Sequence, residues 1–222
     1  MPSSGRGQSG LTAGGATILR AVNPSAPICN PVIAAIEARR SIVRLTSDRP
    51  ARADVEAILR AAVHAPNHHH THPWRFAVLA GDARRTAGEA LATSFDRRTG
   101  TAGTTADQAS RANESVKFLR APVVICVAVE PAPGEPLDEE VSAGAAAVQN
   151  MLLAAHSLGL GAAWRTGATV RDPDAARDFG FAPGAVLIGF VYLGVPDPTQ
   201  LPKPRPPRPA LADVVRWNGW DD

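Results

Sequence analysis

Cysteine is scarce in this chain of 222 residues, which contains only Cys29 and Cys126. The two stand far apart and in different contexts, so neither a disulfide framework nor a metal site built on cysteine pairs is expected. Cys126 lies in the apolar run 123–129. It is therefore expected to be a small buried side chain without a chemical role.

The chain also lacks an excess of charge of one sign and long apolar runs. The formal net charge is +2, which gives no strong attraction to nucleic acid or to a membrane surface. No segment approaches the roughly 20 apolar residues that a membrane-spanning helix needs. No apolar segment follows Arg6 as it would in a secretory signal. We expect a cytoplasmic protein with no nucleic-acid or membrane partner.

What is present is enough hydrophobic sequence, 45% of the chain, for one ordinary core. Residues 1–28 are rich in Gly, Ser and Pro and are predicted to be a flexible leader. Residues 29–222 are predicted to form one domain. The proline-dense segment 196–209 near its end cannot be a regular helix or internal strand, and is expected to be an extended C-terminal arm.

Hydrophobic periodicity predicts an α+β fold, with strands separated by helices. The longest helix is expected from about Glu139 to Leu158, with almost no charge after Glu140. It should therefore be central in the fold or at a subunit interface, and Gly159 is placed to end it in a left-handed conformation. The other expected helices begin near 31, 51, 83, 107 and 173, and the expected strands are 74–79, 123–129, 160–164, 185–193 and 211–217.

Five of the six histidines lie between His64 and His72. Imidazole is a common ligand for zinc, copper and nickel, so a metal site is one interpretation. Adjacent side chains in a loop diverge, however, and the run contains no Asp, Glu or Cys. We therefore predict a polar loop that lines a cleft, and we assign no metal.

Three further segments could bind an anion. Arg39, Arg40 and Ser41 offer two guanidinium groups and a hydroxyl, which suit a phosphate. The segment 159–167 carries three glycines that let a ligand approach the backbone. The segment 201–208 holds three cations among prolines. Each segment also has an interpretation that needs no ligand: surface arginines for the first, a helix cap with a turn for the second, and a solvated linker for the third.

The order and spacing of these pieces resemble the FMN-dependent nitroreductase family from about Asn30 to Trp220. The resembling pieces are Arg39-Arg40-Ser41, Ala65-Pro66, Pro73-Trp74-Arg75-Phe76, Arg120-Ala121-Pro122, Ser142-Ala143-Gly144, Gln149 to Ala155, Leu158 to Gly161, Trp164-Arg165-Thr166-Gly167, Gly194-Val195-Pro196 and Trp217 to Trp220.

The resemblance implies a nitroreductase-like fold: a mixed, mainly antiparallel sheet surrounded by helices, in an interlocked homodimer with two FMN molecules at the subunit interface. It implies FMN contacts from two subunits. Arg39, Arg40 and Ser41 would hold the phosphate and ribityl side, with Arg205 and Lys203 completing the phosphate clamp. Trp164, Arg165 and Thr166 would lie along the isoalloxazine ring, and His64 and His68 would reach the flavin from the other subunit.

This sequence departs from the family pattern at two positions. Many members carry Lys or Arg two residues after the serine, where this chain has Val43. Many members also carry Gln at the position of His72. The groups that would meet the pyrimidine edge of the flavin are therefore not assigned.

The implied function is an FMN-dependent NAD(P)H oxidoreductase, in which NADH or NADPH and then a small acceptor such as a nitroaromatic or a quinone use one site in turn, with ping-pong kinetics. The flavin carries this chemistry, so no catalytic side chain is assigned. The alternatives are a relative specialised for another flavin reaction, a protein that sequesters flavin without efficient NAD(P)H turnover, and a metal-binding protein that uses the histidine loop.

Overall fold

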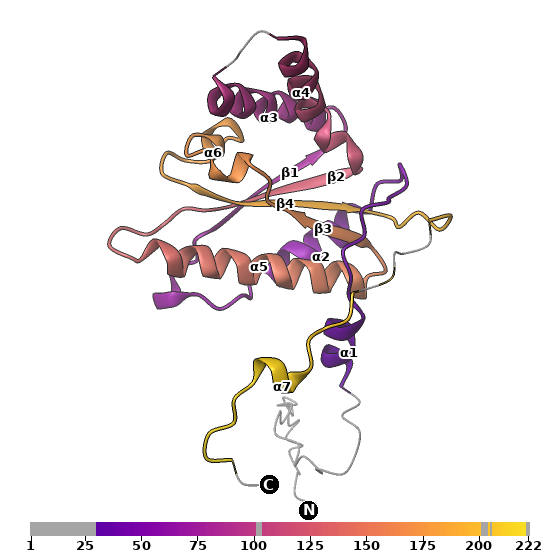
Figure 1. Ribbon diagram of the computed structural model, residues 1–222, viewed down its shortest axis with the longest axis vertical. Helices are drawn as coiled ribbons and strands as arrows, with labels where there is room; N and C mark the ends of the chain where they lie inside the picture. Colours follow the sequence, from indigo (N-terminus) through magenta and orange to yellow (C-terminus); the bar gives the residue numbers. More distant parts are fainter. Residues whose placement is uncertain (1–29, 101–103, 201–203, 205, 221–222) are drawn as a thin grey trace, which may run out of the picture.

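The centre of the fold is a four-stranded sheet of strand order β1-β2-β4-β3, with every neighbouring pair antiparallel (Figure 1). The structure is a computed structural model that describes residues 30–100, 104–200, 204 and 206–220. The predicted leader 1–28 lies outside these residues. The strands are β1 (Trp74–Ala80), β2 (Val123–Val129), β3 (Gly161–Arg165) and β4 (Val186–Gly194).

Strand β2 lies in the interior of the sheet, which fits its uniformly apolar sequence. All seven of its residues are buried, as expected for a continuous apolar run that is covered on both faces. Alternate residues point to opposite faces, so β2 contributes Val123, Ile125, Val127 and Val129 to one core and Cys126 to the other. The expected burial of Cys126 is confirmed, and burial raises the pKa of its thiol well above the usual range.

Helix α5 (Leu137–Ser157) covers one face of the sheet, together with α2 (Arg52–Ala62). Val148 and Met151 of α5 and Ile58 of α2 are fully buried in this core. The expectation that this apolar helix is central is confirmed, and its place at a subunit interface stays a prediction. It ends as predicted at Gly159, which has a φ of +73°.

The opposite face is covered by α3 (Ala83–Thr99), α6 (Ala175–Asp178) and the short 3-10 helix η2 (Lys117–Arg120). Helix α4 (Thr105–Ser115) packs against α3, as Figure 1 shows. Phe118 anchors η2 and packs edge-on against Phe190 of β4, with ring centroids 5.0 Å apart. The helix expected over 107–120 is therefore two elements, because the chain bends at Val116 so that Phe118 can enter the core. The α+β class is confirmed.

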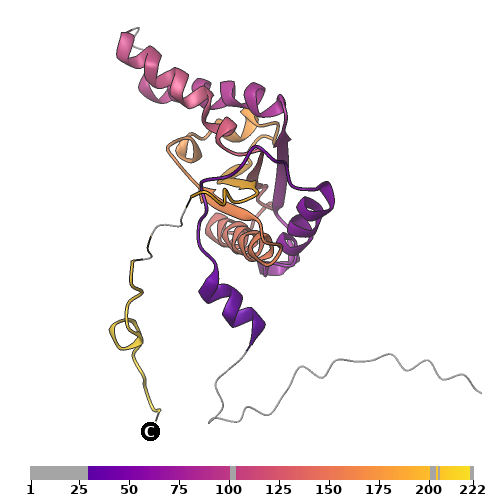
Figure 2. The same ribbon diagram turned by 90° about the vertical axis from the view of Figure 1, so that its right-hand side faces the viewer.

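The two ends of the described chain leave the body on the same side (Figure 2). Helix α1 (Pro31–Ala38) is capped by the Asn30 side chain, which accepts from the Val32 N–H at 2.8 Å. Near the C-terminus, residues 211–214 form the short helix α7 (Leu211–Val214). The strand expected over 211–217 is wrong, because this apolar segment is exposed and pairs with no strand of the described sheet. Among the described residues, no helix is long and apolar enough to cross a membrane.

Candidate functional site

The residues after α1 run alongside strand β3. Arg39 and Arg40 are half-buried and Ser41 is exposed. The Ile42 N–H donates to the Ala162 carbonyl at 3.0 Å, and the Thr46 N–H donates to the Val195 carbonyl at 2.9 Å. These backbone bonds join the segment 39–46 to β3 and to the end of β4.

Gly161 makes this close approach possible. A Cβ atom at this position would lie 2.6 Å from Leu45 Cδ2 and 3.0 Å from Ile42 Cγ2. The first distance is shorter than real Cβ contacts allow, so a larger residue at 161 would push the segment 39–46 away from the strand. The glycine-rich turn is thus needed for packing as well as for ending α5.

The side chains of Trp164 and Arg165 lie on opposite faces of the sheet. Trp164 pairs with Val191 on the α5 face, and its indole N–H donates to the Ile188 carbonyl at 3.2 Å. Arg165 pairs with Phe190 on the other face. The two residues therefore cannot contact one face of a flat ligand together through their side chains.

A cleft of about 390 Å³ opens where β3 ends. Two of the predicted site residues, Arg165 and Thr166, line it, and so does Val43 from the segment 39–46. The remaining wall comes from α3, α4, η2, the turn after β3 and β4: Leu91, Phe95, Arg98, Glu114, Lys117, Phe118, Arg120, Gly167, Ala168, Thr169, Phe190 and Tyr192.

The cleft combines aromatic walls with positive charge. Its lining holds four cations and one anion, Glu114, which forms an ion pair with Lys117. Burial raises the pKa of Tyr192 to about 12, although the nearby positive charges of Arg120 and Arg165 act in the opposite direction. Tyr192 therefore keeps its proton near neutral pH and can donate a hydrogen bond.

One wall of the cleft is fixed by a buried ion pair. Asp172, which follows the turn after β3, accepts from Arg97 of α3 at 2.6 Å, and Arg97 also pairs with Asp178. Burial by itself would raise the pKa of Asp172. The hydrogen bonds from Arg97, Ser94 and the Asp174 N–H outweigh burial and hold this pKa below its usual value of 3.8. The pair ties α3 to the turn that carries Thr166.

His68 lies at the other end of α5. It begins the short 3-10 helix η1 (His68–His70), and its Nδ1 lies 2.9 Å from Glu139 in the first turn of α5. His64 follows α2 further along α5, where the Asn150 side chain donates to the Ala61 carbonyl at 3.1 Å. Arg39 to Ser41 lie beside β3, which follows the last turn of α5 (Figure 1). A helix of 21 residues is about 31 Å long, so one chain does not bring His68 to the two arginines and the serine.

Lys203 and Arg205, the remaining predicted site residues, lie outside the described residues. The cations Arg98 and Lys117 and the hydroxyl of Tyr192 were missed in the sequence. Arg120-Ala121-Pro122, a part of the family resemblance, was the one sequence signal near them. No local spacing links α3, η2 and β4, which meet only in the folded chain.

Comparison with known proteins places these features in a family. The nitroreductase family matches residues 36–195. The Escherichia coli K12 protein YdjA, whose name proposes an NAD(P)H nitroreductase, is 34% identical over 161 residues, which are 71% of this chain and 84% of YdjA.

Solved structures agree with this match. A nitroreductase-like protein from Bacillus cereus superposes with a TM-score of 0.72 at 25% identity, covering 88% of this chain and 100% of that one. A Desulfovibrio desulfuricans protein solved in complex with FMN superposes with a TM-score of 0.63 at 29% identity, covering 86% and 99%.

Proposed function

This chain belongs to the nitroreductase family, and from that premise we propose that it is an FMN-dependent oxidoreductase that oxidises NADH or NADPH and reduces a small acceptor. The observation that carries the proposal is the backbone pairing of the segment 39–46 with β3. It sets Arg39, Arg40 and Ser41 on the strand whose far end opens into the cleft beside Thr166.

The segment 39–46 and β3 together carry groups that fit FMN. Two guanidinium groups and a hydroxyl are the donors that a terminal phosphate accepts best, and Arg binds phosphate through two parallel hydrogen bonds. Because Gly161 has no side chain, the segment that carries these donors can lie directly against β3. Arg39, Arg40 and Ser41 would hold the phosphate and ribityl side, with Lys203 and Arg205 adding charge from the C-terminal arm. The backbone of Thr166 and Gly167 would border the ring.

Trp164 and Arg165 lie on opposite faces of the sheet, and this changes the contacts that we propose for the flavin ring. Arg165 lines the cleft, whereas the Trp164 indole bonds to the β4 backbone. In this proposal Arg165 and the Thr166 backbone meet the isoalloxazine ring, and Trp164 positions the end of β3. A protein solved in complex with FMN that is 29% identical to this chain supports FMN as the cofactor.

A second copy of this chain would complete the site. His68 lies nearly a helix length away from Arg39 to Ser41 within one chain, so we expect it to reach the flavin from a partner, together with His64. Exposed apolar residues at both ends of the described chain suit such a partner. Val32 and Ile33 of α1 are 61% and 40% exposed, and Trp217 and Trp220 are 66% and 72% exposed. We propose a homodimer on these grounds.

The cleft would receive the nicotinamide and then the acceptor. When bound, FMN supplies the two-electron transfer chemistry, so the side chains need only bind, orient and exclude water. The partly exposed rings of Phe95 and Tyr192 suit a flat ring. Arg98 and Arg120 offer donors to the negative oxygens of a nitroaromatic or a quinone. Tyr192, protonated near neutral pH, can donate to the same oxygens.

The experiment is to purify tag-free protein, identify any flavin released on denaturation, and measure the mass of the native particle by light scattering. We expect FMN at one per chain and the mass of a dimer. Stopped-flow mixing with NADH and NADPH should then bleach the flavin absorbance, and a nitroaromatic or a quinone should restore it. A protein that binds FMN without bleaching would be a flavin-sequestering protein. A colourless protein that cannot be reconstituted with FMN would overturn the cofactor assignment.

A further inference from the structure

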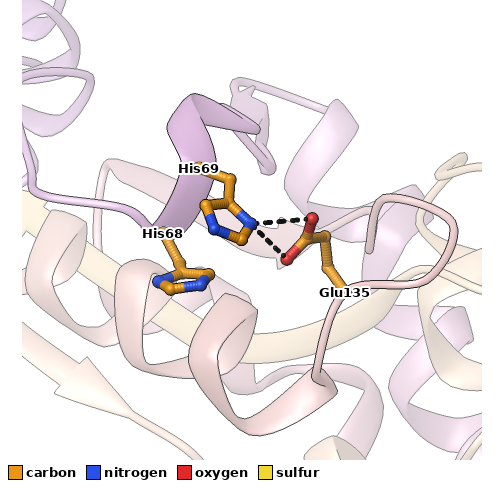
Figure 3. Close-up of side chains that lie close together, drawn as sticks. All are labelled: His68, His69 and Glu135. Carbon is orange, nitrogen blue, oxygen red and sulfur yellow. Dashed lines mark hydrogen bonds and ion pairs between the residues drawn. The ribbon is translucent and has the colours of Figure 1, made fainter.

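Three metal-binding atoms from separate side chains converge beside the first turn of α5 (Figure 3). The donor atoms of His68, His69 and Glu135 all lie within 4.8 Å of one another. His69 Nδ1 lies 3.1 Å and 3.2 Å from the two Glu135 oxygens. We propose that this cluster, the His68–His69–Glu135 site, binds a divalent transition metal ion such as zinc.

The geometry needs little adjustment for such an ion. Zinc bonds to nitrogen and carboxylate oxygen are about 2.0–2.2 Å long, which places two tetrahedral ligands about 3.3–3.5 Å apart. The distances from His69 Nδ1 to the Glu135 oxygens are already close to this separation. His68 needs only a small shift, because its ring centroid lies 3.8 Å from that of His69. Both side chains are exposed and free to make this shift.

Glu139 supports the site as an outer-shell partner. One of its carboxylate oxygens lies 2.9 Å from His68 Nδ1, and Glu139 is not among the residues whose donor atoms converge. An ion held by the other ring nitrogen of His68, Nε2, would leave Nδ1–H to donate to this carboxylate, as ligating histidines usually do. The two imidazoles and Glu135 match the nitrogen and oxygen ligands that zinc accepts, and the two carboxylates balance its charge. The positive end of the α5 dipole opposes a cation here, and the second carboxylate offsets that repulsion.

The backbone of the loop explains how neighbouring histidines converge. His69, His70 and His72 have φ values of +47°, +56° and +49°, a left-handed conformation that residues other than glycine rarely adopt. In an extended loop the side chains of residues 68 and 69 would diverge. The left-handed turn at His69 instead directs both rings toward Glu135 (Figure 3). Strained residues of this kind tend to occur where function requires them.

This finding changes the interpretation of the histidine run. The sequence argued against a metal because the run contains no acidic residue. The fold supplies the carboxylate from Glu135, which is 66 residues away from His69. The inference goes beyond the proposed oxidoreductase and does not depend on it. His69 and Glu135 are not among the predicted FMN residues, whereas His68 is, and in this site it would bind the metal.

The test is equilibrium dialysis of tag-free, FMN-loaded protein against zinc, with the metal measured by mass spectrometry and FMN measured by absorbance on the same samples. We expect one tightly bound zinc per chain. His69→Ala and Glu135→Gln should each weaken zinc binding by more than the 10–100-fold that the loss of an outer-shell partner costs. The FMN content should not change.

His70→Ala is the matched control, because it removes a histidine from the same loop that is outside the cluster. It should leave zinc affinity within about twofold of the wild type. Failure of wild-type protein to bind one zinc per chain would overturn the proposal. So would an equal loss of zinc in His70→Ala and His69→Ala, which would show nonspecific binding to clustered imidazoles. If the purified protein lacks FMN but binds zinc, the metal site is supported and only the proposed oxidoreductase function is contradicted.

Discussion

The two ends of helix α5 carry opposite kinds of chemistry. At its C-terminal end, the segment 39–46, β3 and the cleft place arginine and lysine side chains around aromatic walls. At its N-terminal end, the histidine loop lies against the acidic side chains of Glu135 and Glu139. The first end is suited to anions and flat rings, and the second end is suited to a cation.

The ends also differ in how they are held. At the cleft end, backbone hydrogen bonds to β3 and a buried ion pair fix the segments. At the loop end, the ion pairs are exposed histidine–carboxylate pairs, and the Thr71 hydroxyl and the His72 N–H add hydrogen bonds to Glu140 and Asn67. Exposed ion pairs contribute little to stability. An ion pair should therefore contribute to folding stability at the cleft end of α5 and mainly to ligand binding at the loop end.

The largest effect is expected from Gly161→Val, which attacks the cleft end directly. Its side chain would collide with Leu45 and Ile42 and should lower the free energy of unfolding by about 3 kcal/mol, the upper range for overpacking. FMN content should fall with it. Thermal and urea unfolding would measure the loss.

A second change separates this collision from a general loss of packing. Leu45→Ala removes the Cδ2 atom that the new side chain meets first, so the double variant should recover at least about 1 kcal/mol relative to the sum of the single changes. Strict additivity would show that the segment 39–46 does not depend on Gly161.

The next effect concerns FMN affinity. A charge-assisted hydrogen bond contributes about 1.5–3 kcal/mol, so Arg39→Ala should weaken FMN binding by roughly tenfold to a hundredfold. Arg60→Ala removes the same charge from the exposed end of α2 and is the control. FMN fluorescence titration would compare them, and equal affinity in the two variants would place the phosphate elsewhere.

The smallest effect compares an ion pair from each end. Asp172→Asn should cost about 1–2 kcal/mol of stability, less than a fully buried pair, because Arg97 remains partly exposed. Glu135→Gln should cost less than about 0.5 kcal/mol, since His69 is largely exposed. Chemical denaturation at pH 7 would measure both losses.

The Asp172 pair also predicts a pH dependence. The pKa of this carboxyl is lower in the folded chain than its usual 3.8, so its contribution is fully present above about pH 4 and is lost as the pH falls through the folded value. The difference in melting temperature between wild type and Asp172→Asn should therefore shrink below pH 4. A constant difference down to pH 3 would contradict this assignment.

Much of the secondary structure could be predicted from the sequence because it depends on local pattern. The apolar run 123–129 became β2, and the uncharged stretch before Gly159 became α5. The apolar segment 211–217 misled the same reasoning, because a strand also needs a free edge to pair with. This segment pairs with no described strand, although β1 lies at an edge of the sheet.

The sequence by itself determined the family, the order of helices and strands, and the two arginines and the serine that suit a phosphate, since these depend on residues close together in the chain. The tertiary structure alone decided which face of the sheet Trp164 and Arg165 each meet, and that α3, η2 and β4 build one cleft. It also decided that Glu135 meets the histidine loop. Such contacts join residues tens of positions apart, and no local periodicity encodes them.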